Sequence, residues 1–287
     1  MEQKNIKIPD RLTLISIDEI CSPLHSINSG GNTIFDLSDV EFVTPEALVL
    51  LVTASNLFHK KTSRAVMWKN VRSNVRSYMD RMNINDLPFV SLEHPFFFQK
   101  HPYAKSNALI ELSTIANSHE IGSAIIRTRE ILNRWFPSRP QEYVRNLSTL
   151  FKESFENSIE HSSSEPSNGF CYYALQKYSC SDNTTEIQIA IGDIGIGMLA
   201  SQKRMYPSTR DDVEAIIKAL DGRSGRTNGN GGMGFANIRE ALECVNGHLT
   251  IRSGRARIEY PHKKSTAHIY RHSISYPGTQ TIFKCRA

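Results

Sequence analysis

The chain has 287 residues, of which 39% are hydrophobic and 22% charged, and this composition excludes a disordered or collagen-like polypeptide. Its 34 Lys and Arg against 29 Asp and Glu give a formal net charge of only +5, too small for a protein whose whole surface coats nucleic acid. The length suffices for one large domain or two ordinary ones.

The cysteines and the N-terminal residues indicate a compartment. Five cysteines, an odd number without any CxxC spacing, predict neither a disulfide framework nor a zinc site. The stretch MEQKNIKIPDRL has no apolar signal core, and the longest apolar run falls far short of the roughly 20 residues that span a membrane. We therefore expect a soluble protein of the reducing cytoplasm, without membrane association.

The first hundred residues alternate between strand-like and helix-like patterns. Strands are predicted over residues 7–17, 32–37 and 65–68, and helices over residues 45–61 and 71–82. Residues 87–103 carry three prolines without a clear period, so we interpret them as a connector. These patterns predict a first α/β domain over residues 1–103.

Residues 104–287 form the second predicted domain, again of α/β class. Helices are predicted over residues 107–135, 141–161 and 235–245, and strands over residues 169–177, 186–191, 248–252, 255–260, 267–273 and 279–285. In the helix over 141–161, apolar residues at spacings of three and four predict a buried stripe, formed by Val144, Leu147, Phe151, Phe155 and Ile159.

The same helix carries a polar face with Glu153, Asn157 and His161 one turn apart. A carboxylate and an amide four residues apart point the same way. The amide oxygen can bind a hard cation such as Mg²⁺, and the carboxylate can activate a water or a hydroxyl group. A solvated helix face has the same spacing, so this motif alone does not decide between the two interpretations.

A second motif, DIGIGM at residues 193–198, follows an apolar strand. A carboxylate at a strand end, here Asp193, can accept a hydrogen bond from an exocyclic amine. The glycines Gly195 and Gly197 permit close approach of the backbone to a planar ring. A plain β-turn is the alternative interpretation.

A third, glycine-rich motif precedes the helix over 235–245 and includes Gly229, Gly231, Gly232, Met233 and Gly234. Free backbone N–H groups at a helix N-terminus suit an anion such as a triphosphate. The string also satisfies G-x-G-x-x-G, but no strand precedes it, which argues against a dinucleotide-binding fold. A P-loop is excluded because the chain contains no Gly-Lys pair.

The order of these motifs resembles the GHKL (Bergerat-fold) ATPases. E-x-x-x-N, D-x-G-x-G, a glycine-rich box and a terminal Gly-Thr strand follow one another within residues 107–287. The resemblance implies ATP and Mg²⁺ as cofactors, Glu153 as general base, Asn157 as Mg²⁺ ligand and Asp193 as adenine contact. It also implies a lid over residues 199–228 and nucleotide contacts at Gly195, Gly197, Met198, Gly229, Gly231, Gly232, Met233, Gly234 and Thr279.

The first domain resembles STAS domains, the fold of anti-sigma-factor antagonists. The resemblance rests on NTIFDLSDVEFVTPEALVLL at residues 32–51 and on the helix, strand and helix predicted around and after it. Phosphorylated members carry Asp-Ser where this chain has Thr44-Pro45, and proline has no hydroxyl group; Thr44 is the nearest one left. We therefore expect a docking module for a protein partner, and a homodimer is compatible with the resemblance.

Three activities are compatible with such an ATPase domain. We expect a nucleotide-controlled regulatory switch that hydrolyses ATP; a serine/threonine kinase of the anti-sigma type needs the same residues with a protein hydroxyl as acceptor. A non-hydrolysing ATP sensor is the third alternative, although it has no need of a base at Glu153. A histidine kinase is disfavoured because only the 33 residues 120–152 separate His119 from Glu153, too few for a dimerisation hairpin as well.

The net positive charge is concentrated in residues 252–287, which hold eight Lys or Arg and one Glu. Such a segment can bind nucleic acid. A solvated hairpin face or a partner-binding surface explains the same charge, and we favour these over a nucleic-acid site.

Overall fold

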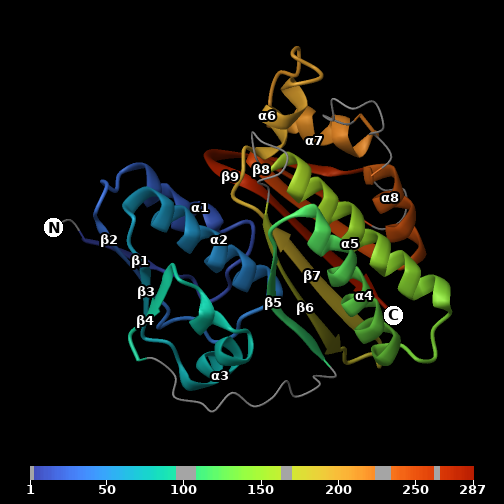
Figure 1. The fold of residues 1–287 in the computed structure, drawn as a ribbon, viewed down its shortest axis with the longest axis horizontal. Helices are drawn as coiled ribbons and strands as arrows, with labels where there is room; N and C mark the ends of the chain where they lie inside the picture. The colour runs from blue at the N-terminus through green and yellow to red at the C-terminus, as the bar shows by residue number, and fades with distance from the viewer. Residues whose placement is uncertain (1–2, 95–107, 163–169, 224–233, 262–265) are drawn as a thin grey trace. The chain divides into compact units, whose positions relative to one another are not determined.

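The computed structural model describes residues 3–94, 108–162, 170–223, 234–261 and 266–287. The described chain is of mixed α/β class and contains two separate sheets (Figure 1). Its contacts divide it into two compact units, Met1–Ser106 and Asn107–Ala287. None of the helices in the described residues combines the length and the hydropathy needed to cross a membrane.

The first unit is built on a four-stranded parallel sheet in the order β1-β2-β3-β4. Its strands are β1 (Gln3–Lys7), β2 (Asn32–Asp36), β3 (Val66–Lys69) and β4 (Val90–Leu92), and its helices are α1 (Ile17–Cys21), α2 (Pro45–Thr62) and α3 (Ser73–Arg81), with short 3₁₀ turns η1 (Ser22–His25) and η2 (Ile84–Asp86).

Two elements of this unit differ from the sequence prediction. The strand predicted over residues 7–17 is wrong, because β1 spans Gln3–Lys7 and residues 8–16 contain no strand. The segment after β1 turns back on itself: Thr13 N–H donates to Ser16 Oγ at 3.1 Å, and α1 begins at Ile17. The segment interpreted as a connector contains β4, which pairs with β3 in parallel. Its three residues are too few for a period to be visible.

Helix α2 begins where its sequence provides a cap. The Thr44 side chain accepts a hydrogen bond from Ala47 N–H at 3.1 Å, and Pro45 occupies the first helical position, where no N–H is needed. The helix ends at Thr62 and is followed by its C-cap Ser63, which takes a left-handed conformation with φ of 59°. Its residues 45–58 are buried on every side, so α2 is the central helix of the unit rather than an amphipathic surface helix.

The second unit is built on a five-stranded antiparallel sheet in the order β5-β6-β7-β9-β8. Its strands are β5 (Leu109–Ile115), β6 (Cys171–Ser179), β7 (Thr185–Gly192), β8 (Gly247–Tyr260) and β9 (His268–Arg286). Its helices are α4 (Ser118–Trp135), α5 (Gln141–His161), α6 (Gly197–Lys203), α7 (Asp212–Leu220) and α8 (Gly234–Cys244). Figure 1 shows α4, α5 and α8 lying over one face of the sheet.

The apolar stripe predicted on α5 is confirmed. All five of its residues are buried in the core between the helices and the sheet: Val144, Leu147, Phe151, Phe155 and Ile159. The Phe155 ring lies 4.8 Å from the ring of Tyr173 on β6, measured between centroids. Because this stripe fixes the rotation of α5 about its axis, the polar positions of the same helix are fixed as well.

Residues 107–135 are not one helix as predicted. They form β5, which pairs with β6, and then α4, which begins after Asn117. The Asn117 side chain accepts a hydrogen bond from His119 N–H at 3.0 Å and caps the helix. The short apolar run before the cap satisfies either secondary structure, and its pairing with β6 decides in favour of the strand.

The four strands predicted after residue 247 are two long strands with irregularities. The β8–β9 register shifts between Ser253 and Gly254, and again before Ala256. Gly254 has a positive φ of 56°, and a Cβ there would lie 2.1 Å from Asp212 Oδ1. The predicted breaks are therefore bulges that bend a continuous hairpin, not loops between separate strands.

Replacing Thr44 by Ala removes the cap of α2. We expect the free energy of unfolding of the first unit to fall by about 1 kcal/mol, because Ala47 N–H loses its acceptor. Urea unfolding, followed by Trp68 fluorescence in a Trp135→Phe background, measures this change. Thr44→Ser keeps the hydroxyl group and should stay within about 0.5 kcal/mol of the parent; equal losses in both variants would contradict the capping role.

Candidate functional site

Glu153 and Asn157 lie on the side of α5 that faces the first turn of α8. Glu153 is buried, and its Oε1 accepts a hydrogen bond from Asn237 Nδ2 at 2.9 Å. A Cβ on Gly234 would lie 3.0 Å from Glu153 Oε2 and 3.7 Å from Asn157 Oδ1. The first motif and the end of the third, about 80 residues apart in the sequence, therefore meet in the structure.

Asn157 contributes an unsatisfied polar group to the contact between α5 and α8. Its Nδ2 atom is buried and has no hydrogen-bond partner among the described residues. Buried amide groups are nearly always hydrogen-bonded, and the two ends of an amide are assigned from their partners. The Nδ2 atom is therefore available to a group that the described residues do not supply.

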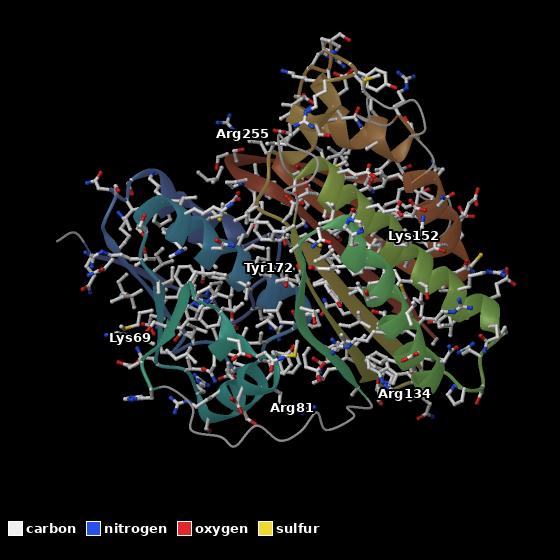
Figure 2. The ribbon with its side chains drawn as sticks, viewed as in Figure 1. Lys69, Arg81, Arg134, Lys152, Tyr172 and Arg255 are labelled. Atoms are coloured by element: carbon white, nitrogen blue, oxygen red, sulfur yellow. The ribbon has the colours of Figure 1, made fainter. Side chains whose placement is uncertain are left out.

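Lys152 places a positive charge next to Glu153 on α5. Its Nζ lies 3.1 Å from Glu156 Oε1 and 3.6 Å from Glu153 Oε1. The side chain is half exposed at 52%, and Figure 2 shows it on α5. Lys152 Nζ and Asn237 Nδ2 therefore both lie close to Oε1 of Glu153.

Asp193 directly follows β7, and its side chain is buried. Its Oδ1 accepts hydrogen bonds from Gly195 N–H at 2.8 Å and Thr279 N–H at 3.2 Å. Its Oδ2 receives no hydrogen bond from a described residue. The backbone is fixed too, because Asp193 N–H donates to Thr279 O at 2.9 Å and Gln280 Nε2 donates to Asp193 O at 3.2 Å. The terminal Gly-Thr strand thus holds the aspartate of the second motif.

Burial dominates the ionisation of Asp193. It raises the pKa of the carboxyl group to about 7, while the hydrogen bonds from the amides of Gly195 and Thr279 act in the opposite direction. Near neutral pH this side chain therefore exchanges between an anionic form and a neutral one, which is unusual for an aspartate and common at functional sites.

The glycines of the second motif and of the Gly-Thr strand permit close approach of backbone to backbone. A Cβ on Gly195 would lie 1.7 Å from Ser162 O, just after α5, and Ile196 N–H donates to that oxygen at 3.0 Å. A Cβ on Gly278, whose φ is 85°, would lie 2.3 Å from Asp193 O. These contacts attach the Asp193 turn to the end of α5 and to β9.

Cys171 connects the Asp193 turn with the polar face of α5. This buried thiol is close enough to Asp193, and to the hydroxyl group of Ser158 next to Asn157, for both to act on its pKa. Burial raises the pKa of the thiol, so it stays neutral. Asn157 and Asp193 therefore belong to one end of the second unit.

Part of the predicted site lies outside the described residues, namely Gly229, Gly231, Gly232 and Met233, together with lid residues 224–228. Met198 lies at the start of α6 and packs against the core. Two polar residues of the site escaped the sequence prediction, Asn237 on Glu153 and Ser253, whose Oγ accepts from Met198 N–H at 2.9 Å. No sequence pattern marked either one.

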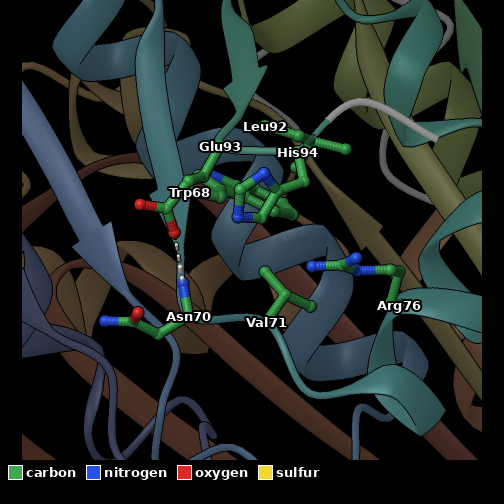
Figure 3. A pocket seen from close by; sticks show the side chains of 7 residues that line it. All are labelled: Trp68, Asn70, Val71, Arg76, Leu92, Glu93 and His94. Atoms are coloured by element: carbon green, nitrogen blue, oxygen red, sulfur yellow. Dashed lines mark hydrogen bonds between the residues drawn. The ribbon is translucent and has the colours of Figure 1, made fainter.

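A small pocket in the first unit lies between the ends of β3 and β4 (Figure 3). Trp68, Arg76 and His94 are among its lining residues, and Asn70 N–H donates to Glu93 Oε2 across it at 3.2 Å. Its cavity volume of about 10 Å³ is far below the roughly 300 Å³ at which ligand pockets begin. We assign no ligand to it.

Comparisons with known proteins add no family. No protein-family model matches the chain, and a search of curated proteins finds no significantly similar sequence. Roles for Glu153, Asn157, Asp193 and Thr279 therefore rest on the motifs and on the geometry described above.

Replacing Asp193 by Asn should change how stability depends on pH. The folded-state pKa of about 7 lies above the unfolded value, so the wild type loses stability as pH rises from about 4 to about 7. The Asp193→Asn variant has no carboxyl group at this position, so its stability does not fall in this way as pH rises. Its unfolding free energy relative to the wild type should rise by roughly 2 to 3 kcal/mol between pH 5 and pH 8.

Urea unfolding at the two pH values measures the difference. Asp182→Asn is the matched control, because Asp182 is exposed and its hydrogen bonds with Thr184 lower the pKa of its carboxyl group. It is ionised throughout this pH range in both states. A pH-independent difference between Asp193→Asn and the wild type would show that Asp193 does not carry a raised pKa.

Proposed function

We propose that residues 104–287 are a Bergerat-fold ATP-binding domain of the GHKL type and that residues 1–103 are a STAS-like regulatory domain. The observation that carries the proposal is the meeting of separate motifs at one end of the second unit. Glu153 and Asn157 lie against Gly234, and Asp193 lies against Thr279. Chance motif matches scattered over a chain have no reason to converge in this way.

The residues present fit ATP. Asp193 Oδ2, on a buried side chain and without a described partner, is an acceptor suited to an exocyclic amine. Helix α8 begins at Gly234, and the free N–H groups of a first helical turn suit phosphate oxygens. Ligand contacts at Gly195, Gly197 and Met198 are part of the proposal, as are those at the glycines and Met233 that precede α8.

The residues present also fit Mg²⁺. The described residues contain no cluster of three or more His, Cys, Asp or Glu side chains that could hold a metal. Mg²⁺ bound beside a nucleotide needs no such cluster, because it takes one or two protein oxygens together with phosphate and water. Asn157, whose Oδ1 faces Gly234 and whose Nδ2 lacks a described partner, is the proposed ligand through its amide oxygen.

Glu153 is the proposed general base. Asn237 donates to its Oε1 and so fixes the carboxylate, leaving Oε2 to accept a proton from a water or a hydroxyl group. Bound Mg-ATP supplies the phosphoanhydride bond that is broken. Only glycine at position 234 leaves Oε2 uncrowded, since a Cβ there would lie 3.0 Å away.

The proposed lid favours a regulatory switch over the alternatives. Its helix α7 is attached to the β8–β9 hairpin, because Arg271 Nη1 lies 3.0 Å from Asp211 Oδ2 and Arg255 N–H donates to Asp212 Oδ2 at 2.9 Å. A change of the lid on nucleotide binding therefore reaches the hairpin. A serine/threonine kinase of the anti-sigma type remains the second candidate, with a partner's hydroxyl group as acceptor.

A protein partner is proposed for the STAS-like domain. The Thr44 hydroxyl caps α2, and Pro45 follows it, so this position serves the helix rather than phosphorylation. Ile15 and Phe42 near the start of α2 are large apolar side chains at 63% and 60% exposure. Exposed apolar side chains of this size are common in protein interfaces. A second copy of the chain is one such partner.

Replacing Glu153 by Ala should abolish phosphate release from Mg-ATP while ATP affinity changes only a few-fold. The loss of a general base lowers turnover by roughly 100-fold or more. Phosphate release and an ATP-binding titration measure the two effects, with Glu156→Ala on the same helix as the matched control. Unaltered release in Glu153→Ala would contradict its role, and binding without release by the wild type would favour the kinase or a sensor.

A further inference from the structure

Ser253 is a fully buried serine of β8 whose hydroxyl group joins three segments. Its Oγ lies 2.9 Å from Met198 N, 3.0 Å from Gly278 O and 3.1 Å from Thr279 Oγ1. Met198 belongs to the second motif and Gly278 and Thr279 to the Gly-Thr strand, so the serine connects two parts of the proposed nucleotide site.

The three contacts determine the direction of each hydrogen bond. Met198 N–H can only donate, so Ser253 Oγ accepts from it. Gly278 O can only accept, so the single proton of the Ser253 hydroxyl goes to that carbonyl. The remaining contact must then be donated by Thr279. In this arrangement every contact of Ser253 is a satisfied hydrogen bond.

The direction of the last bond determines what Thr279 offers to a ligand. Its only hydroxyl proton is donated to Ser253, so Oγ1 of the half-buried Thr279 keeps only lone pairs for a ligand. The neighbouring Asp193 is joined to Thr279 N–H through Oδ1 at 3.2 Å. Its Oδ2 is also an acceptor when the carboxyl group is ionised.

We infer that Ser253 is a positioning residue that sets the base preference of the nucleotide site. By holding the Thr279 proton, it makes this end of the site a pair of acceptors, which favours a purine with an amine at its six position. A purine with a carbonyl group at that position would place its acceptor oxygen against the acceptor oxygens of Thr279 and Asp193, so those hydrogen bonds would not form. This inference rests on the proposed ATP-binding function.

The ratio of the dissociation constants of inosine triphosphate and ATP tests this inference. Inosine carries a carbonyl where adenine carries its amine, and at pH 8 Asp193 is ionised. We expect the wild type to prefer ATP. Ser253→Ala frees the Thr279 hydroxyl to rotate and donate, so the ratio should fall roughly three- to tenfold, the value of about one hydrogen bond.

Three further variants separate specificity from stability. Thr279→Val removes the acceptor and should lower the ratio of the two dissociation constants similarly. Thr279→Ser keeps the hydroxyl group, so its ratio should equal that of the wild type. Ser148→Ala is the matched control, because this buried serine donates to Val144 O within α5. Its ratio should equal that of the wild type even if its melting temperature falls.

The outcomes distinguish this inference from the function on which it rests. A wild type that binds neither nucleotide contradicts the proposed function and the inference with it. A wild type that prefers ATP, together with an unchanged ratio in Ser253→Ala, overturns the inference alone. If Ser253→Ala does not fold, an unchanged ratio in Thr279→Val overturns it equally.

Discussion

Asp193 places an ionisable carboxyl group inside the protein. Burying this group costs free energy, and the surrounding segments of the second unit are arranged so that they offset part of that cost. The backbone amides of Gly195 and Thr279 offset part of the cost by donating to one carboxyl oxygen. These bonds require the backbone of Gly278 to lie close to the Asp193 carbonyl group. A side chain at position 278 would prevent this approach. The turn after β7, the bend in β9 and the end of α5 are all positioned by this one requirement.

The second constraint is the division of α5 into two faces. Its apolar stripe is held by the core, and the opposite polar positions are consequently aimed at the first turn of α8. Glu153 is buried there because Asn237 and Lys152 provide it with a hydrogen bond and a charge. A helix that is fixed by packing can hold catalytic side chains more precisely than a loop can.

Strong periodicity made some elements predictable from the sequence. Helix α5 was found with its true bounds, and its stripe followed from spacing alone. The boundary between β5 and α4 was missed, since a seven-residue apolar run fits either structure until its partner strand is known. The continuity of β8 and β9 was missed for a similar reason, because bulges at Gly254 and near Gly278 have the same sequence signs as turns.

The residues of the site were predictable to different degrees. Glu153, Asn157 and Asp193 belong to motifs with a spacing that carries chemistry. Asn237 and Ser253 do not, because their importance arises from contacts between segments that are far apart in the chain. A serine in a strand and an asparagine in a helix carry no local sign of such a contact. Only the folded arrangement identifies them.

Amide hydrogen exchange with and without Mg-ATP tests the central claim most directly, since it reports on each segment separately. The account predicts slower exchange together in the Asp193 turn and α6, in the first turn of α8 and around Thr279 of β9, because one nucleotide contacts all three. Protection confined to one segment, protection in the first unit alone, or no change at saturating Mg-ATP would contradict a single nucleotide site assembled from these motifs.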